Sequence, residues 1–163
     1  DLGYLALACH NTLSEKWAKV IDDSLDNYDF SYLVSPGSGI PDSYTGIACY
    51  ASGNIFDMMN MPASCYNIAV AGPSTWRLEY WYMETGGGVG YDWGTTSQNL
   101  AIGAGSWNKI SVTTFSDSIA YSVKSEEVKR LRNLSFMKNG LYITVEDSKK
   151  DTLYFKEIIL TKK

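Results

Sequence analysis

The chain has 163 residues, of which 45% are hydrophobic, 20% charged and 13% aromatic, and its formal charge is −4. This length predicts a single domain over residues 1–163 with a sizeable core, and the apolar content excludes a disordered chain. An acidic chain without a basic stripe is unlike a nucleic-acid-binding protein. Its apolar runs fall far short of the roughly 18 residues that cross a bilayer, so we expect neither a nucleic-acid partner nor membrane insertion.

The N-terminal part predicts one strand and one short helix. A strand is expected over residues 4–9, and a helix over residues 12–24. Thr12 and Glu15 are spaced as a capping box, in which each side chain bonds an unpaired amide of the first turn. The apolar face of this helix carries Leu13, Trp17, Val20 and Ile21.

Most of the remaining chain alternates between apolar and polar residues, which is typical of strands. Residues 125–132 are the exception, because acids come first and bases last, which suits the dipole of a two-turn helix. The absence of a helix between successive strands predicts an antiparallel β-sandwich of jelly-roll type. The strands are expected at residues 28–34, 45–50, 65–70, 75–83, 98–102, 107–115, 118–123, 141–145 and 152–161.

The same alternation divides the aromatic residues between core and surface. Most of them fall on positions that a sandwich core would cover. The expected core residues are Tyr28, Phe30, Tyr32, Tyr66, Trp76, Tyr80 and Tyr82.

The segment 75–83 carries the first candidate site. Alternation places Arg77, Glu79 and Trp81 on the face opposite the expected core. An indole covers the apolar face of a sugar ring, while charged groups bond its hydroxyls, so this mixture is typical of carbohydrate recognition. The alternative is an Arg–Glu ion pair on a solvated sheet face, with the indole covered by a loop.

A glycine-rich loop over residues 84–94 carries the second group of candidates. It lacks the Gly-Lys-Ser/Thr ending of a phosphate-binding loop and the spacing of a dinucleotide fingerprint. Tyr91 and Trp93 follow the glycines, and aromatic residues on a loop beside a polar sheet face are plausible binding residues. The alternative is a hairpin whose aromatic residues fold back onto the core.

The sequence indicates a catalytic site or a metal site less clearly than a sugar-binding face. Glycoside hydrolysis needs two opposed carboxyl groups, and the local candidates are Glu79, Glu84 and Asp92. We assign no catalytic residue and expect no cofactor. A structural calcium ion would suit the scattered carboxylates, but no ligand set is identifiable.

The three cysteines, Cys9, Cys49 and Cys65, allow at most one disulfide. Cys49 and Cys65 could close a short loop, but sequence does not place their Cβ atoms within bridging distance. The favoured interpretation is that all three are small buried apolar residues.

The last part of the chain resembles a known family. A strand that begins with Trp107, a strand after Gly140 and an aromatic-apolar closing strand are similar to those of carbohydrate-binding modules of the galactose-binding-like jelly-roll type. The segment 76–83 is similar to the family's central strand, and the resemblance covers about residues 65–160. Lys156 departs from the acidic or amide residues that are usual in the closing strand, where they help to build the family's calcium site.

The resemblance and the candidate residues together predict non-catalytic carbohydrate binding. The ligand-binding residues would be Arg77, Glu79, Trp81, Tyr91 and Trp93. The chain would be part of a larger multidomain protein that is secreted or displayed at the cell surface. The alternatives are a protein-interaction or adhesin-like surface domain, in which exposed aromatic residues anchor a protein partner, and a glycan-active enzyme.

Overall fold

Every regular element that the computed structural model describes is a β-strand. The described residues are 5–8, 14–21, 27–36, 44–51, 55–56, 61–62, 64–71, 75–82, 89–95, 106–132, 134, 140–147 and 152–163. Within these ranges, no helix has the length and apolar character that a membrane span requires.

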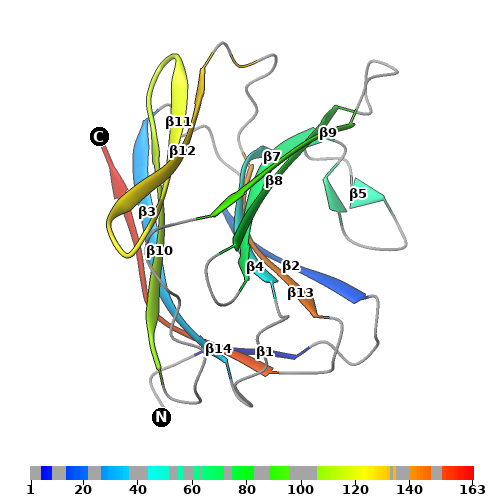
Figure 1. Ribbon diagram of the computed structural model, residues 1–163, viewed down its shortest axis with the longest axis vertical. Helices are drawn as coiled ribbons and strands as arrows, with labels where there is room; N and C mark the ends of the chain where they lie inside the picture. The colour runs from blue at the N-terminus through cyan, green and yellow to red at the C-terminus, as the bar shows by residue number, and fades with distance from the viewer. Residues whose placement is uncertain are drawn as a thin grey trace.

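Two six-stranded antiparallel sheets face each other and form a sandwich (Figure 1). The first sheet has, in spatial order, β1 (Leu5–Ala8), β14 (Thr152–Lys162), β3 (Tyr28–Pro36), β10 (Asn108–Thr114), β11 (Ser118–Val123) and β12 (Glu126–Arg132). The second has β2 (Ser14–Ile21), β13 (Gly140–Asp147), β4 (Tyr44–Ala51), β7 (Ser64–Ala71), β8 (Thr75–Tyr82) and β9 (Val89–Thr95). A short third sheet pairs β5 (Ile55–Phe56) with β6 (Met61–Pro62). The predicted all-β, antiparallel sandwich is therefore confirmed.

The core lies between the two large sheets and follows the alternation of the sequence. Along β3, Tyr28, Phe30 and Tyr32 are buried, while the residues between them are partly exposed. In the opposite sheet, Tyr66 of β7 and Leu78 of β8 are also buried and belong to the same core. These residues confirm the predicted strand phases, since successive side chains of a strand point to opposite faces. The side chains of Trp76, Tyr80 and Tyr82 lie outside the described part of the structure.

Tyr32 shows how buried polar atoms join the two sheets. Its ring packs edge-on against Phe155 of β14, with the ring centroids 5.3 Å apart. Its hydroxyl donates a 3.0 Å hydrogen bond to the carbonyl oxygen of Gly46 in β4 and lies 3.0 Å from the Thr45 hydroxyl. The phenol thereby buries its ring while its oxygen keeps partners, as a buried tyrosine requires.

The predicted N-terminal helix over residues 12–24 is wrong. Residues Ser14–Ile21 form β2, which pairs with β13 along the edge of the second sheet. The ladder to β13 pairs the backbone groups on one side of this edge strand, so tertiary pairing overrides the local helical pattern.

The helical interpretation of residues 125–132 is also wrong. Residues Glu126–Arg132 form β12, which is joined to β11 by a tight turn at Lys124 and Ser125. Both turn residues have positive φ, 47° and 72°, as the two-residue hairpin turn that matches the strand twist demands.

The structure also corrects the glycine-rich loop over residues 84–94. Residues Val89–Thr95 form strand β9, so Tyr91 and Trp93 belong to the sheet rather than to a loop. The strand predicted at residues 98–102 lies outside the described residues.

Two of the three cysteines are described, and both are buried free thiols. Cys49 of β4 and Cys65 of β7 form no disulfide. The interpretation as buried apolar residues is confirmed for these two, and Cys9 lies outside the described residues.

Candidate functional site

Pairing of β7, β8 and β9 aligns the predicted binding residues in rows that share one face of the second sheet. Arg77 of β8 lies directly between Ala69 of β7 and Trp93 of β9. Two residues further along β8, in the next row of the same face, Glu79 lies between Asn67 and Tyr91. Directly opposed residues of an antiparallel pair share one face of the sheet, and their Cβ atoms lie about 5 Å apart.

Trp81 occupies the third row of the same face. It lies opposite Cys65 on β7 and opposite Val89 on β9. The register therefore brings all five predicted residues to one corner of the second sheet, although they come from two separate segments of the chain. Their side chains lie outside the described part of the structure.

This face points away from the core. Leu78, which lies between Arg77 and Glu79 along β8, is 1% exposed and belongs to the core cluster. Asn67 and Ala69 alternate with the core residue Ile68 and stand outside that cluster. We call this surface of the second sheet the outer face. Its rows contain Arg77, Glu79, Trp81, Tyr91 and Trp93, together with Cys65, Asn67 and Ala69 of β7.

The central strands of the outer face carry a buried polar pair. The Thr144 hydroxyl of β13 donates a 3.0 Å hydrogen bond to the side-chain oxygen of Asn67 on β7. Both residues are at most 5% exposed. A buried amide and hydroxyl are expensive to leave unpaired, and their bond fixes the rotamers of both side chains beside the row that contains Glu79.

Gly46 provides the space for this pair. It lies on β4 between Thr144 and Ala69 in the register. A Cβ atom at this position would collide with the backbone oxygen of Ile68 and would lie 2.7 Å from the Thr144 hydroxyl oxygen. Only glycine fits, because the backbones and the polar pair come too close for any side chain.

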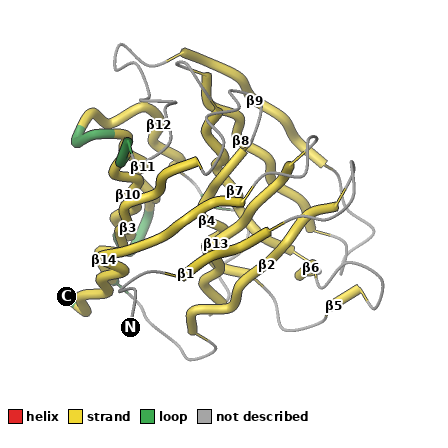
Figure 2. Tube along the Cα trace, turned by 90° about the horizontal axis from the view of Figure 1, so that it is seen from below, coloured by secondary structure: helices red, strands yellow, loops and turns green. Residues whose placement is uncertain are grey.

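The short hairpin β5–β6 lies on the same side of the second sheet. Figure 1 shows β5 beyond β7 and β8, away from the first sheet, and Figure 2 shows the same relation from below. On the outer face, Cys65, Asn67 and Ala69 of β7 and Thr144 of β13 are all buried, so the central part of this face is covered.

The strand register separates one pair of candidate catalytic carboxylates. Asp92 lies opposite Leu78, whereas Glu79 lies opposite Tyr91. Adjacent rows alternate between the two faces of a sheet, so Glu79 and Asp92 belong to opposite faces. Opposed carboxyl groups across one sugar site would need a shared face. Glu84 lies outside the described residues.

No cluster suited to a metal ion occurs among the described residues. Within those ranges, no group of three or more His, Cys, Asp or Glu side chains comes together. The structural calcium ion stays a prediction without ligands assigned to it.

Asn67, Thr144 and Gly46 support the outer face structurally, and the sequence alone did not indicate this role. A glycine inside the apolar-polar alternation of residues 45–50 signals a close approach of neighbouring backbones. The hydrogen bond between Asn67 and Thr144 has no comparable signal, because it joins residues that are 77 positions apart in the chain.

Comparison with known proteins finds the fold but no sequence family. No family model matches the chain, and no curated protein matches it in sequence. Solved structures do match, over most of this chain and most of their own length. The sequence identities are so low that the match shows the fold alone.

Three of these structures define the kind of sandwich. The carbohydrate-binding module CBM66 from Bacillus subtilis superposes with a TM-score of 0.60 at 11% identity, over 97% of this chain and 94% of that one. Sheep galectin-11, in complex with glycerol, gives a TM-score of 0.60 at 8% identity, over 91% and 98%. A glycoside hydrolase family 16 endo-glucanase from Bacteroides ovatus gives 0.63 at 7% identity, over 90% and 74%. The chain thus has the jelly-roll, lectin-like sandwich fold that both sugar-binding and sugar-cleaving proteins use.

Proposed function

We propose that the chain binds carbohydrate without cleaving it, at the β8–β9 edge of the outer face of the second sheet, as a module of the galactose-binding-like type. A sugar ring would stack on Trp81, Tyr91 or Trp93, and Arg77 and Glu79 would bond its hydroxyls. Stacking covers the apolar C–H face of a sugar, while the charged groups give directional bonds to its rim. A secreted or cell-surface location is part of this proposal.

The register of β8 and β9 is the observation that carries the proposal. It sets Arg77 opposite Trp93 and Glu79 opposite Tyr91, so each charged residue is paired with an aromatic one. A pair of this kind offers both a stacking surface and a hydrogen-bonding group within the width of one sugar. The likeness to a carbohydrate-binding module and to a galectin adds support through the fold.

A non-catalytic role is favoured over a hydrolase by the position of the carboxylates. Glu79 and Asp92 occupy rows that face opposite sides of the sheet. The endo-glucanase shares the fold, but a shared fold does not transfer a reaction.

The test is a glycan array probed with the wild-type chain and with Trp81→Ala and Trp93→Ala. We expect the wild type to bind at least one neutral glycan and each substitution to weaken that binding by about tenfold or more, since stacked aromatic residues dominate such sites. Phe115→Ala is the matched control, because Phe115 is a partly exposed aromatic residue that follows β10 in the other sheet.

The outcomes separate the activity from the site. Absence of wild-type binding to every glycan would reject carbohydrate binding as the function. Undiminished binding by both variants would keep the function and reject the outer face. Hydrolysis of a bound glycan would favour the enzyme.

One observation supports a protein-interaction role as a second candidate. Ile158, Ile159 and Leu160 of β14 are 41%, 54% and 37% exposed, and exposed apolar side chains on one strand are typical of interfaces. We expect this surface to be dispensable for sugar binding. An Ile159→Ser variant that lost a protein complex seen with the wild type, and kept glycan binding, would establish it.

A further inference from the structure

Three lysines lie along one row at the end of the first sheet. Lys156 of β14 is opposite Leu33 of β3, and Leu33 is opposite Lys109 of β10. The row continues to Lys124, whose backbone amide donates a 2.9 Å hydrogen bond to the carbonyl oxygen of Lys109. Neighbouring strands are about 4.8 Å apart, so the three lysine positions span about 14 Å. We call them the lysine row.

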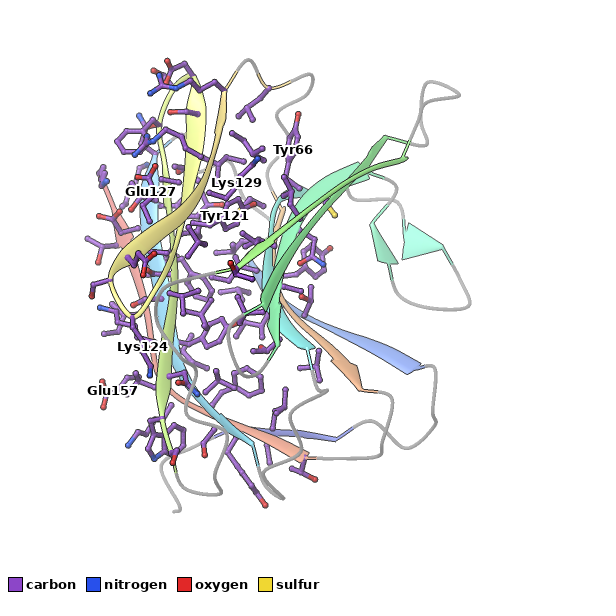
Figure 3. All side chains as sticks on the ribbon, viewed as in Figure 1. Tyr66, Tyr121, Lys124, Glu127, Lys129 and Glu157 are labelled. Carbon is purple, nitrogen blue, oxygen red and sulfur yellow. The ribbon has the colours of Figure 1, made fainter. Side chains whose placement is uncertain are left out.

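The lysine row lies on the side of the first sheet that faces away from the second. Leu33 and Lys109 alternate with the buried residues Val34 and Ile110. Lys109 is exposed, and Lys124 and Lys156 are partly exposed. Figure 3 shows Lys124 and Glu157 on this side, away from the facing sheet.

An aromatic ring holds one of these cations in place. The Lys156 ammonium nitrogen lies 4.1 Å from the centre of the Trp107 ring, and the indole is partly exposed. Trp107 precedes β10 and alternates in phase with Lys109. A cation over an indole is attracted to the ring, so the position of the charge is fixed before a ligand arrives.

This arrangement concentrates positive charge in a chain that is acidic overall. The described strands and turns of the first sheet hold eight basic and five acidic residues. All of these lie within residues 27–36, 106–132 and 152–163. They carry a net charge of +3, whereas the whole chain carries −4. The acidic residues next to the row are Glu126 and Glu157. Like charges at neighbouring positions repel one another, and an anion placed between the lysines would reduce that repulsion.

We propose that the lysine row, with Trp107, is a second binding site, which takes the acidic groups of a negatively charged polysaccharide. Carboxylates or sulfates spaced along the polymer would contact Lys109, Lys124 and Lys156, and the exposed part of the indole would cover an adjacent sugar ring. Three lysines flanked by two acids suit a polymer with spaced charges better than a duplex nucleic acid, whose binding proteins neutralise many consecutive phosphates. The site is separate from the outer face of the second sheet.

The test measures binding to alginate, a polyuronate, and to dextran sulfate, with neutral dextran as the uncharged polymer. The variant is Lys109→Gln with Lys156→Gln. The matched control is Arg132→Gln with Lys162→Gln, which removes the same charge from two exposed positions of the same sheet outside the row. We expect the row variant to bind the preferred polyanion about tenfold or more weakly and the control to change by less than about twofold, with both effects shrinking at high salt.

A charge-preserving variant guards against loss of the fold. Lys109→Arg with Lys156→Arg keeps both cations and should retain binding, and the thermal midpoints of all variants should agree. Stronger binding to alginate or to dextran sulfate identifies the acidic group. Equal losses in the row variant and the control, no wild-type binding to either polyanion, or tighter binding to duplex DNA than to both polysaccharides would each overturn the proposal. Trp81→Ala should leave polyanion binding unchanged, which separates this site from the proposed neutral-glycan site.

Discussion

The hydroxyl of Tyr121, on β11 of the first sheet, donates a 3.0 Å hydrogen bond to the backbone carbonyl oxygen of Tyr66, on β7 of the second. Figure 3 labels both residues on the facing sheets. Tyr121 is 1% exposed, so this bond is buried in the core between the two sheets. Tyr32 makes the equivalent connection from β3 to Gly46 of β4. Two buried phenols thus fix the position of one sheet against the other.

Replacing Tyr121 by Phe removes the cross-sheet bond and keeps the ring. We expect the free energy of unfolding to fall by about 1–2 kcal/mol, because the buried carbonyl of Tyr66 loses a donor without gaining water. Urea unfolding followed by tryptophan fluorescence measures this change. A variant as stable as the wild type would show that the bond contributes nothing to the packing of the two sheets.

Replacing Gly46 by Ala tests the close approach under the outer face. We expect the protein to lose about 2–3 kcal/mol of stability or to fail to fold, because overpacking a close backbone contact forces the strands apart. Removing the Thr144 hydroxyl as well, in Gly46→Ala with Thr144→Ala, should not restore stability, since the collision with the Ile68 backbone oxygen remains. Thermal unfolding of the single and double variants measures this. Recovery in the double variant would place the strain at the Asn67–Thr144 pair instead.

The sequence predicts most of this sandwich because strand alternation is a local signal. The phase of β3 and the burial of Tyr28, Phe30 and Tyr32 follow directly from it. The β11–β12 hairpin does not, since its turn is made by Lys124 and Ser125, neither of which is a usual residue at positive φ. The segment Ser14–Ile21 has a helical spacing of apolar residues and becomes a strand only through its pairing with β13.

Only part of the candidate site can likewise be predicted from the sequence. The shared face of Arg77, Glu79 and Trp81 follows from alternation within one strand. Their alignment with Tyr91 and Trp93 depends on the register between β8 and β9. That register is set by the backbone ladder, and the glycine-rich segment before β9 gives no local indication of it.

The Cys49 thiol should be inert in the folded protein. Burial raises its pKa to about 12, and the hydrogen bonds with Tyr28 and Tyr121, which lower the pKa, only partly oppose this. The thiolate is the reactive form, so at about pH 8 we expect iodoacetamide to leave Cys49 unmodified in buffer and to modify it in denaturing urea. Peptide mass spectrometry after a timed reaction distinguishes the cysteines. Modification of Cys49 at the same rate with and without urea would show that the core opens readily.

The ion pair between Asp29 and Lys163 should stabilise the fold in a pH-dependent way. Partial burial opposes its ionisation, but a 2.6 Å hydrogen bond from the Thr113 hydroxyl and the Lys163 ammonium, 2.9 Å away, hold its pKa below the ordinary 3.8. Because the folded state lowers this pKa, the stabilisation is complete above the unfolded value and is lost as the pH falls through the folded value. Near pH 6, Asp29→Asn should therefore be less stable than the wild type by up to about 1 kcal/mol, which is usual for a half-exposed ion pair. Near pH 2 the difference should vanish, because the carboxylate of the wild type is then protonated. Urea unfolding of both proteins at the two pH values measures this. A difference that persisted unchanged at the lower pH would assign the effect to the shape of the side chain rather than to its charge.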